Sequence, residues 1–348
     1  MSMRVFITGG AGFIGSALTR ILGANGAEVA IFDNFLEQVH GPAPGIALPA
    51  EIVRGDVRDA ELLSATLARF KPDVIVHLAA ETGTGQSADE PARYTSVNVV
   101  GTANLLEAAR RVPPKRIVLA GTRAVYGEGA YLDRTGRRTV PEPRRNEDMV
   151  AGRFGVYDDG VELSPAPTPE DSRPRPSSVY GSSKLMQEYL LQQTQPAFPH
   201  VILRLQNVYG PGQSLKNPYT GVLSIFCQQA QNGQRLNIYE DGEITRDFVF
   251  VDDVARAFAL ACTEERALGR TINIGTGRPL SIRHAAETIL DKLGLARDRY
   301  DVSGMFRAGD VRYAVAEVTK ARELLGWSPN VAFEAGIAVL VKWAQTGG

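Results

Sequence analysis

Tyr180 and Lys184 are the two residues whose types and spacing point most directly to chemistry. They stand four residues apart in a segment predicted to be helical over 178–192, so the phenol and the ammonium lie on one face of that helix. A nearby cation stabilises a phenolate, and Lys184 is therefore predicted to lower the pKa of Tyr180 from about 10 toward neutrality. Tyr180 would then act as a general base. Such pairs also arise by chance in helices, so the interpretation depends on what else the chain binds.

Thr122 follows the strand predicted over 116–120, at the edge where the carboxyl ends of parallel strands face a ligand crevice. Its hydroxyl is placed to share a hydrogen bond with a reacting alcohol or carbonyl, although threonine at a strand end is more often a turn or cap residue. His77 lies inside another predicted strand, and we expect it to be a core or supporting residue rather than a catalytic one. The predicted catalytic residues are therefore Thr122, Tyr180 and Lys184.

Three glycines follow the first predicted strand at the spacing G-x-x-G-x-x-G and precede a predicted helix. Gly9 permits a tight turn, Gly12 lets the backbone approach a pyrophosphate, and Gly15 lets the helix pack closely on the strand. The helix N-terminus adds a favourable field for an anion. Glycines also occur in plain surface turns, but the order strand, loop, helix favours a dinucleotide site.

Asp33 ends the second predicted strand, about twenty residues downstream of the glycines, where a carboxylate accepts hydrogen bonds from an adenosine ribose. Its charge would repel a 2′-phosphate, which predicts NAD rather than NADP as the cofactor. The alternative is an ordinary turn residue. Asp56 follows the third predicted strand and is expected beside the adenine amino group, although alone it would be a loop residue. With NAD bound, the positive nicotinamide ring would add to the effect of Lys184 on Tyr180.

Short β-branched runs alternate with longer amphipathic segments from residue 4 to about residue 204, a pattern typical of βαβ units and a parallel sheet. Each run is nearly continuously apolar, as strands covered on both faces should be. The predicted strands are 4–8, 28–32, 51–54, 73–78, 116–120 and 200–204, and the predicted helices are 13–24, 61–70, 97–110 and 178–192. The fold class is therefore α/β, with a Rossmann-type doubly wound parallel sheet.

The chain changes character in two places. Residues 127–176 contain seven prolines and few apolar residues in register, so we interpret them as a long surface excursion, either a lid or a variable insertion. After Asn207, helices near 221–232, 252–262, 282–293 and 333–343 indicate a smaller α/β domain. We predict a cofactor domain over 1–205 and mainly a substrate-binding domain over 206–348, with 245–275 a candidate to return to the first.

The composition argues against several classes of protein. A chain of 348 residues with 44% hydrophobic content can form a sizeable core, and a formal net charge of −1 offers no basic field for a nucleic acid. Two cysteines form neither a disulfide framework nor a metal site, which fits a reducing cytoplasm. We expect no signal segment, no membrane span and no bound metal.

The combined motifs resemble those of extended short-chain dehydrogenase/reductases, and more narrowly their nucleotide-sugar epimerase/dehydratase branch. The resemblance covers residue 3 to about residue 330 apart from 127–176. It is carried by the glycine loop 9–15, by HLAA at 77–80, by Tyr180 with Lys184, by RLQNVYG at 204–210 and by RDFV at 246–249. It implies a Rossmann domain that holds NAD permanently and a small C-terminal domain that holds a nucleoside-diphosphate sugar.

The resemblance also implies roles for individual residues. Asn207 and Arg246 would contact the substrate pyrophosphate. Tyr239 would stack on the base, while Arg307 and Asp310 would hold the nucleoside end. The remaining substrate contacts would be Thr122, Tyr180, Val222 and Asn237, and the remaining cofactor contacts Phe13, Ile14, Asn34, Val57, Leu78, Ala79, Ala80 and Asn98. Family members pair through the helices predicted over 97–110 and 178–192, so we expect a homodimer.

The implied reaction is a 4-epimerisation. Tyr180 removes the proton of a sugar 4-hydroxyl as C4 delivers hydride to NAD⁺, and return of the hydride to the other face of the 4-keto sugar gives the epimer. Related 4,6-dehydratases carry an Asp-Glu pair directly after the catalytic threonine. This chain has Arg123 and Ala124 there, so dehydration is disfavoured.

The sugar and its nucleotide are suggested by two further stretches, 81–87 and 210–221. These resemble 4-epimerases of deoxythymidine-diphosphate 6-deoxyhexoses, with dTDP-L-rhamnose as the expected substrate. UDP-glucose or UDP-N-acetylglucosamine 4-epimerisation is the first alternative, and reduction of a nucleotide 4-keto sugar is the second. A non-catalytic NAD sensor is the alternative from another class, but a sensor need not keep Thr122, Tyr180 and Lys184 together.

Overall fold

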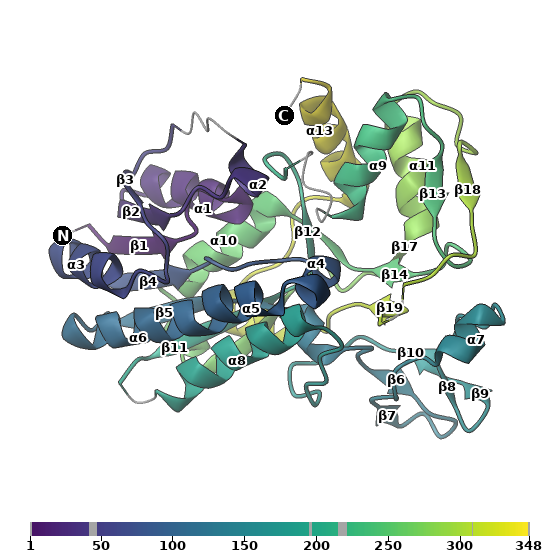
Figure 1. Cartoon of the computed structure of the whole chain (residues 1–348), viewed down its shortest axis with the longest axis horizontal. Coiled ribbons are helices and arrows are strands. Elements are labelled where there is room, and N and C mark those ends of the chain that lie inside the picture. Colours follow the sequence, from purple (N-terminus) through teal and green to yellow (C-terminus); the bar gives the residue numbers. More distant parts are fainter. Residues whose placement is uncertain (1, 42–46, 195–196, 215–220, 308, 347–348) are drawn as a thin grey trace.

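A seven-stranded parallel sheet forms the centre of the computed structural model, which describes residues 2–41, 47–194, 197–214, 221–307 and 309–346 (Figure 1). The strands lie in the order β16-β11-β5-β4-β1-β2-β3, and all neighbours are parallel. Their bounds are β1 Arg4–Thr8, β2 Glu28–Asp33, β3 Glu51–Arg54, β4 Val74–His77, β5 Arg116–Thr122, β11 His200–Leu205 and β16 Arg270–Ile274. This confirms the predicted Rossmann-type sheet, in which strand order reverses between β1 and β4 and opens a ligand crevice there.

Helices cover both faces of the sheet (Figure 1). Helices α1 and α10 pack together on one face, and α3, α6 and α8 lie on the other. Successive side chains of β1 point to opposite faces of the sheet. Val5 and Ile7 belong to the hydrophobic cluster that contains α1 and α10, whereas Phe6 belongs to the cluster that contains α3 and α6. The bounds are α1 Phe13–Ala24, α3 Ala60–Phe70, α6 Gly101–Arg111, α8 Val179–Gln193 and α10 Val251–Ala261.

Two predictions about these elements need correction. Strand β3 is mostly exposed, so the expectation that every strand is covered on both faces is wrong for this edge strand. The helix predicted over 97–110 starts earlier, because Pro91 occupies a favourable first helical position. From there α5 Pro91–Tyr94, the π-helical turn η1 Thr95–Val100 and α6 follow one another without a break.

The chain after β12 (Asn207–Tyr209) forms a second group of elements beside the sheet (Figure 1). Helices α9 Val222–Gln231, α11 Ile282–Lys292 and α13 Phe333–Gln345 pack on one another. Short strands pair beside them: β12 with β15 (Phe248–Phe250), β13 (Leu236–Ile238) with β18 (Tyr300–Val302), and β14 (Thr245–Arg246) with both β17 (Leu280–Ser281) and β19 (Tyr313–Ala314). From this part of the chain, β16 joins the central sheet beside β11 and α10 packs against α1.

The shorter elements connect these groups. They are α2 Glu37–His40, α4 Thr84–Asp89, the 3₁₀ turns η2 Arg123–Tyr126 and η3 Glu265–Ala267, and α12 Thr319–Leu325. Among the described helices, none has the length and apolar content needed to cross a membrane.

Residues 127–176 form an ordered unit rather than an irregular excursion. A three-stranded sheet, a two-stranded hairpin and one helix occupy it, and these lie beside β19 (Figure 1). The bounds are β6 Tyr131–Leu132, β7 Arg138–Thr139, α7 Asn146–Val150, β8 Tyr157–Asp158, β9 Val161–Glu162 and β10 Ser164–Pro165. Its buried Tyr131, Val156 and Leu163 pack against Tyr313 and Val315. The apolar anchors are few and far apart in sequence, which is why periodicity did not show them.

Candidate functional site

The glycine loop joins the carboxyl end of β1 to the N-terminus of α1. Gly9 has a φ of +71°, and a Cβ atom there would lie 2.7 Å from the backbone nitrogen of Ala79. A Cβ atom on Gly15 would lie 2.5 Å from the carbonyl oxygen of Gly9, so only glycine allows α1 to approach the loop so closely. On Gly12 it would meet nothing within 4 Å except that same oxygen, at 3.3 Å. The loop is therefore tight at Gly9 and Gly15, with more room at Gly12.

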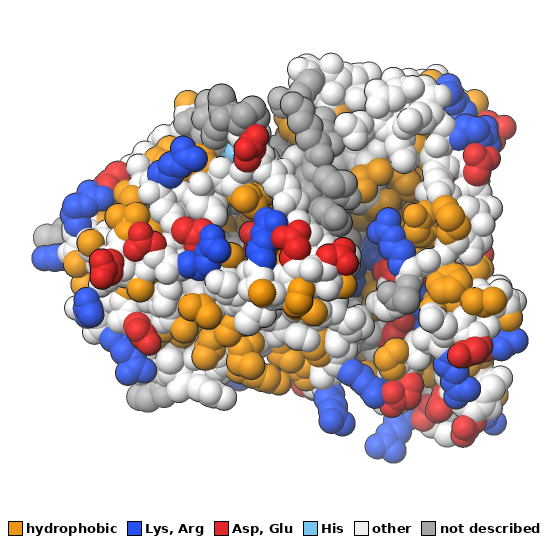
Figure 2. All heavy atoms as spheres, viewed as in Figure 1, with side chains coloured by type: hydrophobic (Ala, Val, Ile, Leu, Met, Phe, Trp, Pro, Cys, Tyr) orange, Lys and Arg blue, Asp and Glu red, His pale blue; other side chains and the backbone are white. Residues whose placement is uncertain are grey.

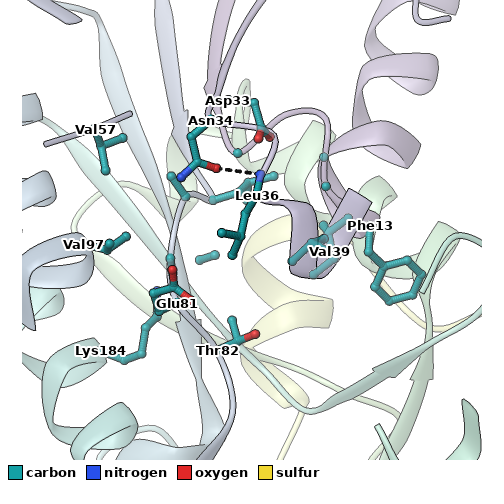
Figure 3. A pocket seen from close by; sticks show the side chains of 18 of the residues that line it. Phe13, Asp33, Asn34, Leu36, Val39, Val57, Glu81, Thr82, Val97 and Lys184 are labelled. Carbon is teal, nitrogen blue, oxygen red and sulfur yellow. Dashed lines mark hydrogen bonds between the residues drawn. The ribbon is translucent and has the colours of Figure 1, made fainter. Parts of the chain in front are cut away.

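A cavity extends from this loop along the carboxyl ends of the central strands, with Asp33 and Asn34 at one end and Thr82 and Lys184 at the other (Figure 3). All the predicted cofactor residues except Asn98 line it: Gly9, Gly12, Phe13, Ile14, Gly15, Asp33, Asn34, Asp56, Val57, Leu78, Ala79, Ala80, Tyr180 and Lys184. Lining residues that sequence reasoning missed include Leu36, Val39, His40, Glu81, Thr82 and Gln206. Gln206 directly follows β11, and the others lie in the segments after β2 and β4, so their place at the carboxyl ends of strands is the signal that could have found them.

Two carboxylates shape the end of the cavity near β2. Asp33 Oδ2 accepts a hydrogen bond from the backbone N–H of Ala11 at 3.0 Å, so the acid braces the glycine loop while it lines the cavity. Asp56 accepts from Arg58 at 2.8 and 2.9 Å and from Asn34 at 3.0 Å. The Arg58 guanidinium is the main reason that the pKa of Asp56 is lowered to about 2. Both carboxylates are therefore hydrogen-bond acceptors that are held in place at this end of the cavity.

Asn98 is the one residue of the predicted cofactor set that lies behind the cavity wall. Its side chain is fully buried in η1 and does not line the cavity. The amide instead bonds the backbone of Glu81, with its oxygen accepting from the N–H at 2.8 Å and its nitrogen donating to the carbonyl at 3.1 Å. It also donates to Ser183 Oγ at 2.9 Å. Asn98 therefore joins the loop after β4 to helix α8, and it acts on the cavity through Glu81.

Thr122 and Tyr180 are brought together as the sequence predicted. Thr122 is the last residue of β5, and Ser178 caps the N-terminus of α8, where its hydroxyl accepts from the N–H of Gly181 at 3.0 Å. The threonine and tyrosine side chains share a hydrogen bond, and both line the cavity. Burial raises the pKa of Tyr180, and the Thr122 hydrogen bond and the positive charge of Arg123 oppose that rise.

The predicted influence of Lys184 on Tyr180 differs from what the structure shows. The Lys184 ammonium donates to Gln187 Oε1, one turn further along α8, and burial lowers the pKa of Lys184 to about 8. The cation that opposes the raised pKa of Tyr180 is instead Arg123. Sequence spacing placed Lys184 on the correct helix but could not show that a buried glutamine lies beside it.

His77 is a buried residue that supports the hydrogen-bond network of Lys184 and Gln187, as expected. Gln187 Nε2 donates to Thr102 Oγ1 at 2.6 Å, and Thr102 Oγ1 lies 2.9 Å from His77 Nε2. The other ring nitrogen lies 2.6 Å from Thr8 Oγ1. Burial, with the nearby charge of Lys184, lowers the pKa of His77 to about 3, so the imidazole is neutral at physiological pH.

Arg123 is a further residue of this site whose contacts sequence reasoning missed. The sequence identified it only as the absence of an acid after Thr122, but its Nε donates to Asn207 Oδ1 at 3.0 Å. Burial and the like charge of Arg246 lower its pKa to about 10, so it remains a cation at neutral pH. Its field acts on both Tyr180 and Asp310. Arg123 thus lies between the catalytic pair and the residues predicted to hold the nucleoside end.

Two side-chain contacts link residues that were predicted to bind substrate. Arg246 Nη2 donates to Asp310 Oδ1 at 2.7 Å, while the guanidinium carbon of Arg307 lies 5.0 Å from the centre of the Tyr239 ring. Asn237 Oδ1 is buried and has no hydrogen-bond partner among the described residues.

Two further predictions concern Val222 and the run 210–221. Val222 begins α9 and packs against the main hydrophobic cluster. In the run 210–221, residues 215–220 lie outside the described part of the chain.

The face shown in Figure 2 is hollowed between the sheet and the C-terminal elements, and charged side chains of both signs border the hollow. Within the described ranges, no group of three His, Cys, Asp or Glu residues is arranged to hold a metal ion.

Comparisons with known proteins agree with this geometry. The model of the NAD dependent epimerase/dehydratase family matches residues 5–147 and 150–275. A dTDP-L-rhamnose 4-epimerase of Burkholderia thailandensis is 41% identical over 347 residues, which is 98% of this chain and 94% of that protein.

Solved structures are similar over the whole chain. The UDP-glucose 4-epimerase of Thermotoga maritima, crystallised with UDP-glucose, has a TM-score of 0.83 at 30% identity and covers 99% of each chain. The UDP-glucose 4-epimerase of Thermus thermophilus, in complex with NAD, has a TM-score of 0.80 at 30% identity, over 99% of this chain and 100% of that one.

Proposed function

The chain belongs to the NAD dependent epimerase/dehydratase family and is an NAD-dependent epimerase, and from this premise we propose that it inverts C4 of a nucleotide sugar, converting dTDP-L-rhamnose to dTDP-6-deoxy-L-talose. The observation that carries the proposal is the hydrogen-bonded pair of Thr122 and Tyr180 in the wall of the cavity. A dinucleotide-sensing protein has no need of such a pair facing its cofactor.

The cavity residues fit an NAD molecule in three respects. The glycine loop leaves room at Gly12, the helix N-terminus of α1 favours a diphosphate, and Asp33 and Asp56 offer carboxylates for the adenosine end. When bound, NAD supplies the acceptor and later the donor of the C4 hydride. The protein supplies binding, orientation and proton transfer.

In the proposed mechanism Tyr180 is the general base. Its phenolate takes the proton of the sugar 4-hydroxyl as C4 loses hydride, and the Thr122 hydroxyl donates to the oxygen that becomes the carbonyl. Arg123 favours the phenolate through its charge. The sugar ring then turns, hydride returns to its opposite face, and Tyr180 gives the proton back to the oxygen.

Dehydration is disfavoured by the residues beside this pair. Loss of water from C5 and C6 needs an acid and a base next to the sugar, and the two positions after Thr122 hold a guanidinium and a methyl group. Arg123 is bonded to Asn207 and is positively charged at neutral pH, so it supplies neither group. Epimerisation needs only the groups that are present.

The nucleotide end of the substrate is proposed to lie at Tyr239, Arg307 and Asn237. A base can stack against the tyrosine ring, and the unpartnered Oδ1 of Asn237 can accept a hydrogen bond from the base. The diphosphate would lie against Arg246 and Arg123, whose mutual repulsion an anion would relieve. Val222 is retained as a substrate contact in the same proposal.

The 41% identical relative supports dTDP-L-rhamnose as the substrate, and the similar UDP-glucose epimerase structures favour UDP-glucose as the second candidate.

We also propose that the protein is a homodimer and that each copy has two domains. Val100, Met186 and Tyr189 are exposed apolar residues on η1 and α8, and hydrophobic side chains gather over α6 and α8 in Figure 2. Pairing of these helices with a second copy would cover them and give a homodimer. Residues 1–205 would form the cofactor domain and 206–348 mainly the substrate domain, apart from α10 and β16.

The test is to incubate the purified protein, without added NAD, with dTDP-L-rhamnose, UDP-glucose and UDP-N-acetylglucosamine separately and to resolve the sugars by NMR. We expect dTDP-L-rhamnose to be converted to its 4-epimer without added NAD, because NAD remains bound to the protein through purification. Conversion of a UDP sugar alone would replace the proposed substrate. If no sugar turns over even with NAD supplied, the epimerase proposal for these sugars fails.

A further inference from the structure

Arg144, in the ordered unit 127–176, is a buried arginine whose two terminal nitrogens both donate hydrogen bonds. Its side chain is 2% exposed. One terminal nitrogen donates to Glu240 Oε2 at 2.9 Å and to the carbonyl of Phe154 at 3.0 Å, and the other donates to the carbonyl of Asp310 at 2.7 Å. The carboxylate of Glu128 lies 3.3 Å away. Such a guanidinium fixes the positions of the groups that it joins.

Two of these partners flank the Tyr239 and Arg307 stack. Glu240 directly follows Tyr239, and its backbone is held at a φ of +54°, which is strained for a residue with a side chain. Asp310 lies three residues after Arg307 and holds Arg246 through its side chain. A single guanidinium therefore ties together both backbone segments that present the stacking pair.

Further bonds hold the unit against the same part of the chain. Thr168 accepts from the N–H of Glu317 at 3.0 Å and donates its own N–H to Val315 at 2.9 Å. Arg312 completes the ion cluster, donating to the shared Glu240 Oε2 at 3.0 Å. These contacts, with the buried apolar cluster described above, attach the unit to 310–317 rather than leaving it free to move over the sugar.

We propose that Arg144 is a positioning residue for the nucleoside end of the substrate, and that the unit 127–176 serves to hold Tyr239 and Arg307 in place. The proposal rests on the proposed function only in assigning the nucleoside to these two residues. It predicts that loss of the guanidinium weakens nucleotide binding while NAD binding and the catalytic step stay intact, since Thr122 and Tyr180 lie on other elements.

The test compares Arg144→Lys and Arg144→Gln with the wild type. Binding of dTDP and of UDP is measured by calorimetry, which needs no knowledge of the sugar, together with NAD content, KM and kcat. The matched control is Arg153→Gln, an arginine of the same unit whose ion pair with Asp148 is at the surface. We expect both Arg144 variants to lose about tenfold in affinity for the nucleotide that the wild type binds, with a matching rise in KM and little change in kcat. The control should behave as wild type.

The outcomes separate the two proposals. Wild-type protein that binds neither dTDP nor UDP contradicts the nucleoside site itself. Wild-type binding with unchanged affinity in the Arg144 variants overturns the role of Arg144 alone. Loss of NAD together with nucleotide affinity also overturns it, because that result indicates general disruption. If Arg144→Gln fails to fold, because its buried carboxylates lose their partner, the charge-retaining Arg144→Lys decides.

Discussion

Arg123 donates a 3.0 Å hydrogen bond to Asn207, and so places a guanidinium between the Thr122–Tyr180 pair and the Arg246–Asp310 ion pair. Arg123 directly follows Thr122, which we propose to be catalytic, at a position where an acid would direct the chemistry toward elimination. The cation instead favours the phenolate of Tyr180. In the proposed mechanism this one side chain therefore disfavours dehydration and assists the proton transfer that epimerisation requires.

Arg123→Gln is expected to move the acidic limb of the pH–kcat profile to higher pH. Burial raises the pKa of Tyr180 and Arg123 opposes that rise, so removal of the charge leaves less phenolate at any pH below that pKa. At pH 7 we expect kcat to fall by about tenfold and to recover in alkaline buffer. The control is Arg134→Gln, at an exposed turn. A profile that keeps its position in Arg123→Gln would show that the charge does not act on the base.

Gly12→Ala and Gly15→Ala should fail in different ways. The new methyl group in Gly15→Ala would lie 2.5 Å from the carbonyl of Gly9, so α1 must shift, and we expect a loss of about 1–3 kcal/mol in the free energy of unfolding. Gly12→Ala meets only a 3.3 Å contact and should fold normally but retain less NAD. Thermal unfolding and NAD content of the purified variants distinguish these effects. Equal NAD retention in Gly12→Ala and wild type would argue against a pyrophosphate at that position.

The sequence predicted the features that depend on short-range patterns. The strands, the glycine loop and the helix bearing Tyr180 are all local, and the strand-end position of Thr122 follows from β5 alone. Contacts between distant residues could not be predicted in the same way. The bond from Arg123 to Asn207, the pairing of Asp310 with Arg246 and the order of 127–176 each depend on residues brought together by the fold. The contacts of Asn98 could not be predicted for the same reason, because its partners lie 17 and 85 residues away in sequence.

His77→Asn should change stability without changing the shape of the pH–rate profile. Both ring nitrogens lie within hydrogen-bond distance of threonines, so the variant is expected to lose about 1–3 kcal/mol in the free energy of unfolding at pH 7. The folded pKa of about 3 is below the unfolded value of about 6.5, so the histidine's contribution is present above pH 6.5 and declines as the pH falls toward 3. Unfolding measured from pH 7 to pH 4 should therefore show a smaller acid loss in the variant. A rate limb between pH 5 and 8 that vanishes in His77→Asn would instead make this residue part of the chemistry.

Met186→Glu should convert the proposed homodimer to a monomer. Met186 and Tyr189 are 44% and 42% exposed on α8, and a carboxylate buried between two copies would be unpaired. Sedimentation velocity of the variant and wild type measures the change, with Val150→Glu as a control, since Val150 is an exposed apolar residue on α7, away from these helices. A wild type that sediments as a monomer would remove the dimer from the account.

The central claim is that hydride leaves C4 of the sugar and returns to C4 without exchange with solvent. The most direct measurement is to run the reaction with the converted nucleotide sugar in D₂O and to locate deuterium in the product by NMR. The account predicts a 4-epimer with no deuterium at any ring carbon, and full retention of label when the substrate carries deuterium at C4. Deuterium acquired from solvent at C4 would contradict transfer to and from the bound cofactor, and deuterium at C5 would show proton exchange at a carbon that a simple 4-epimerisation leaves untouched.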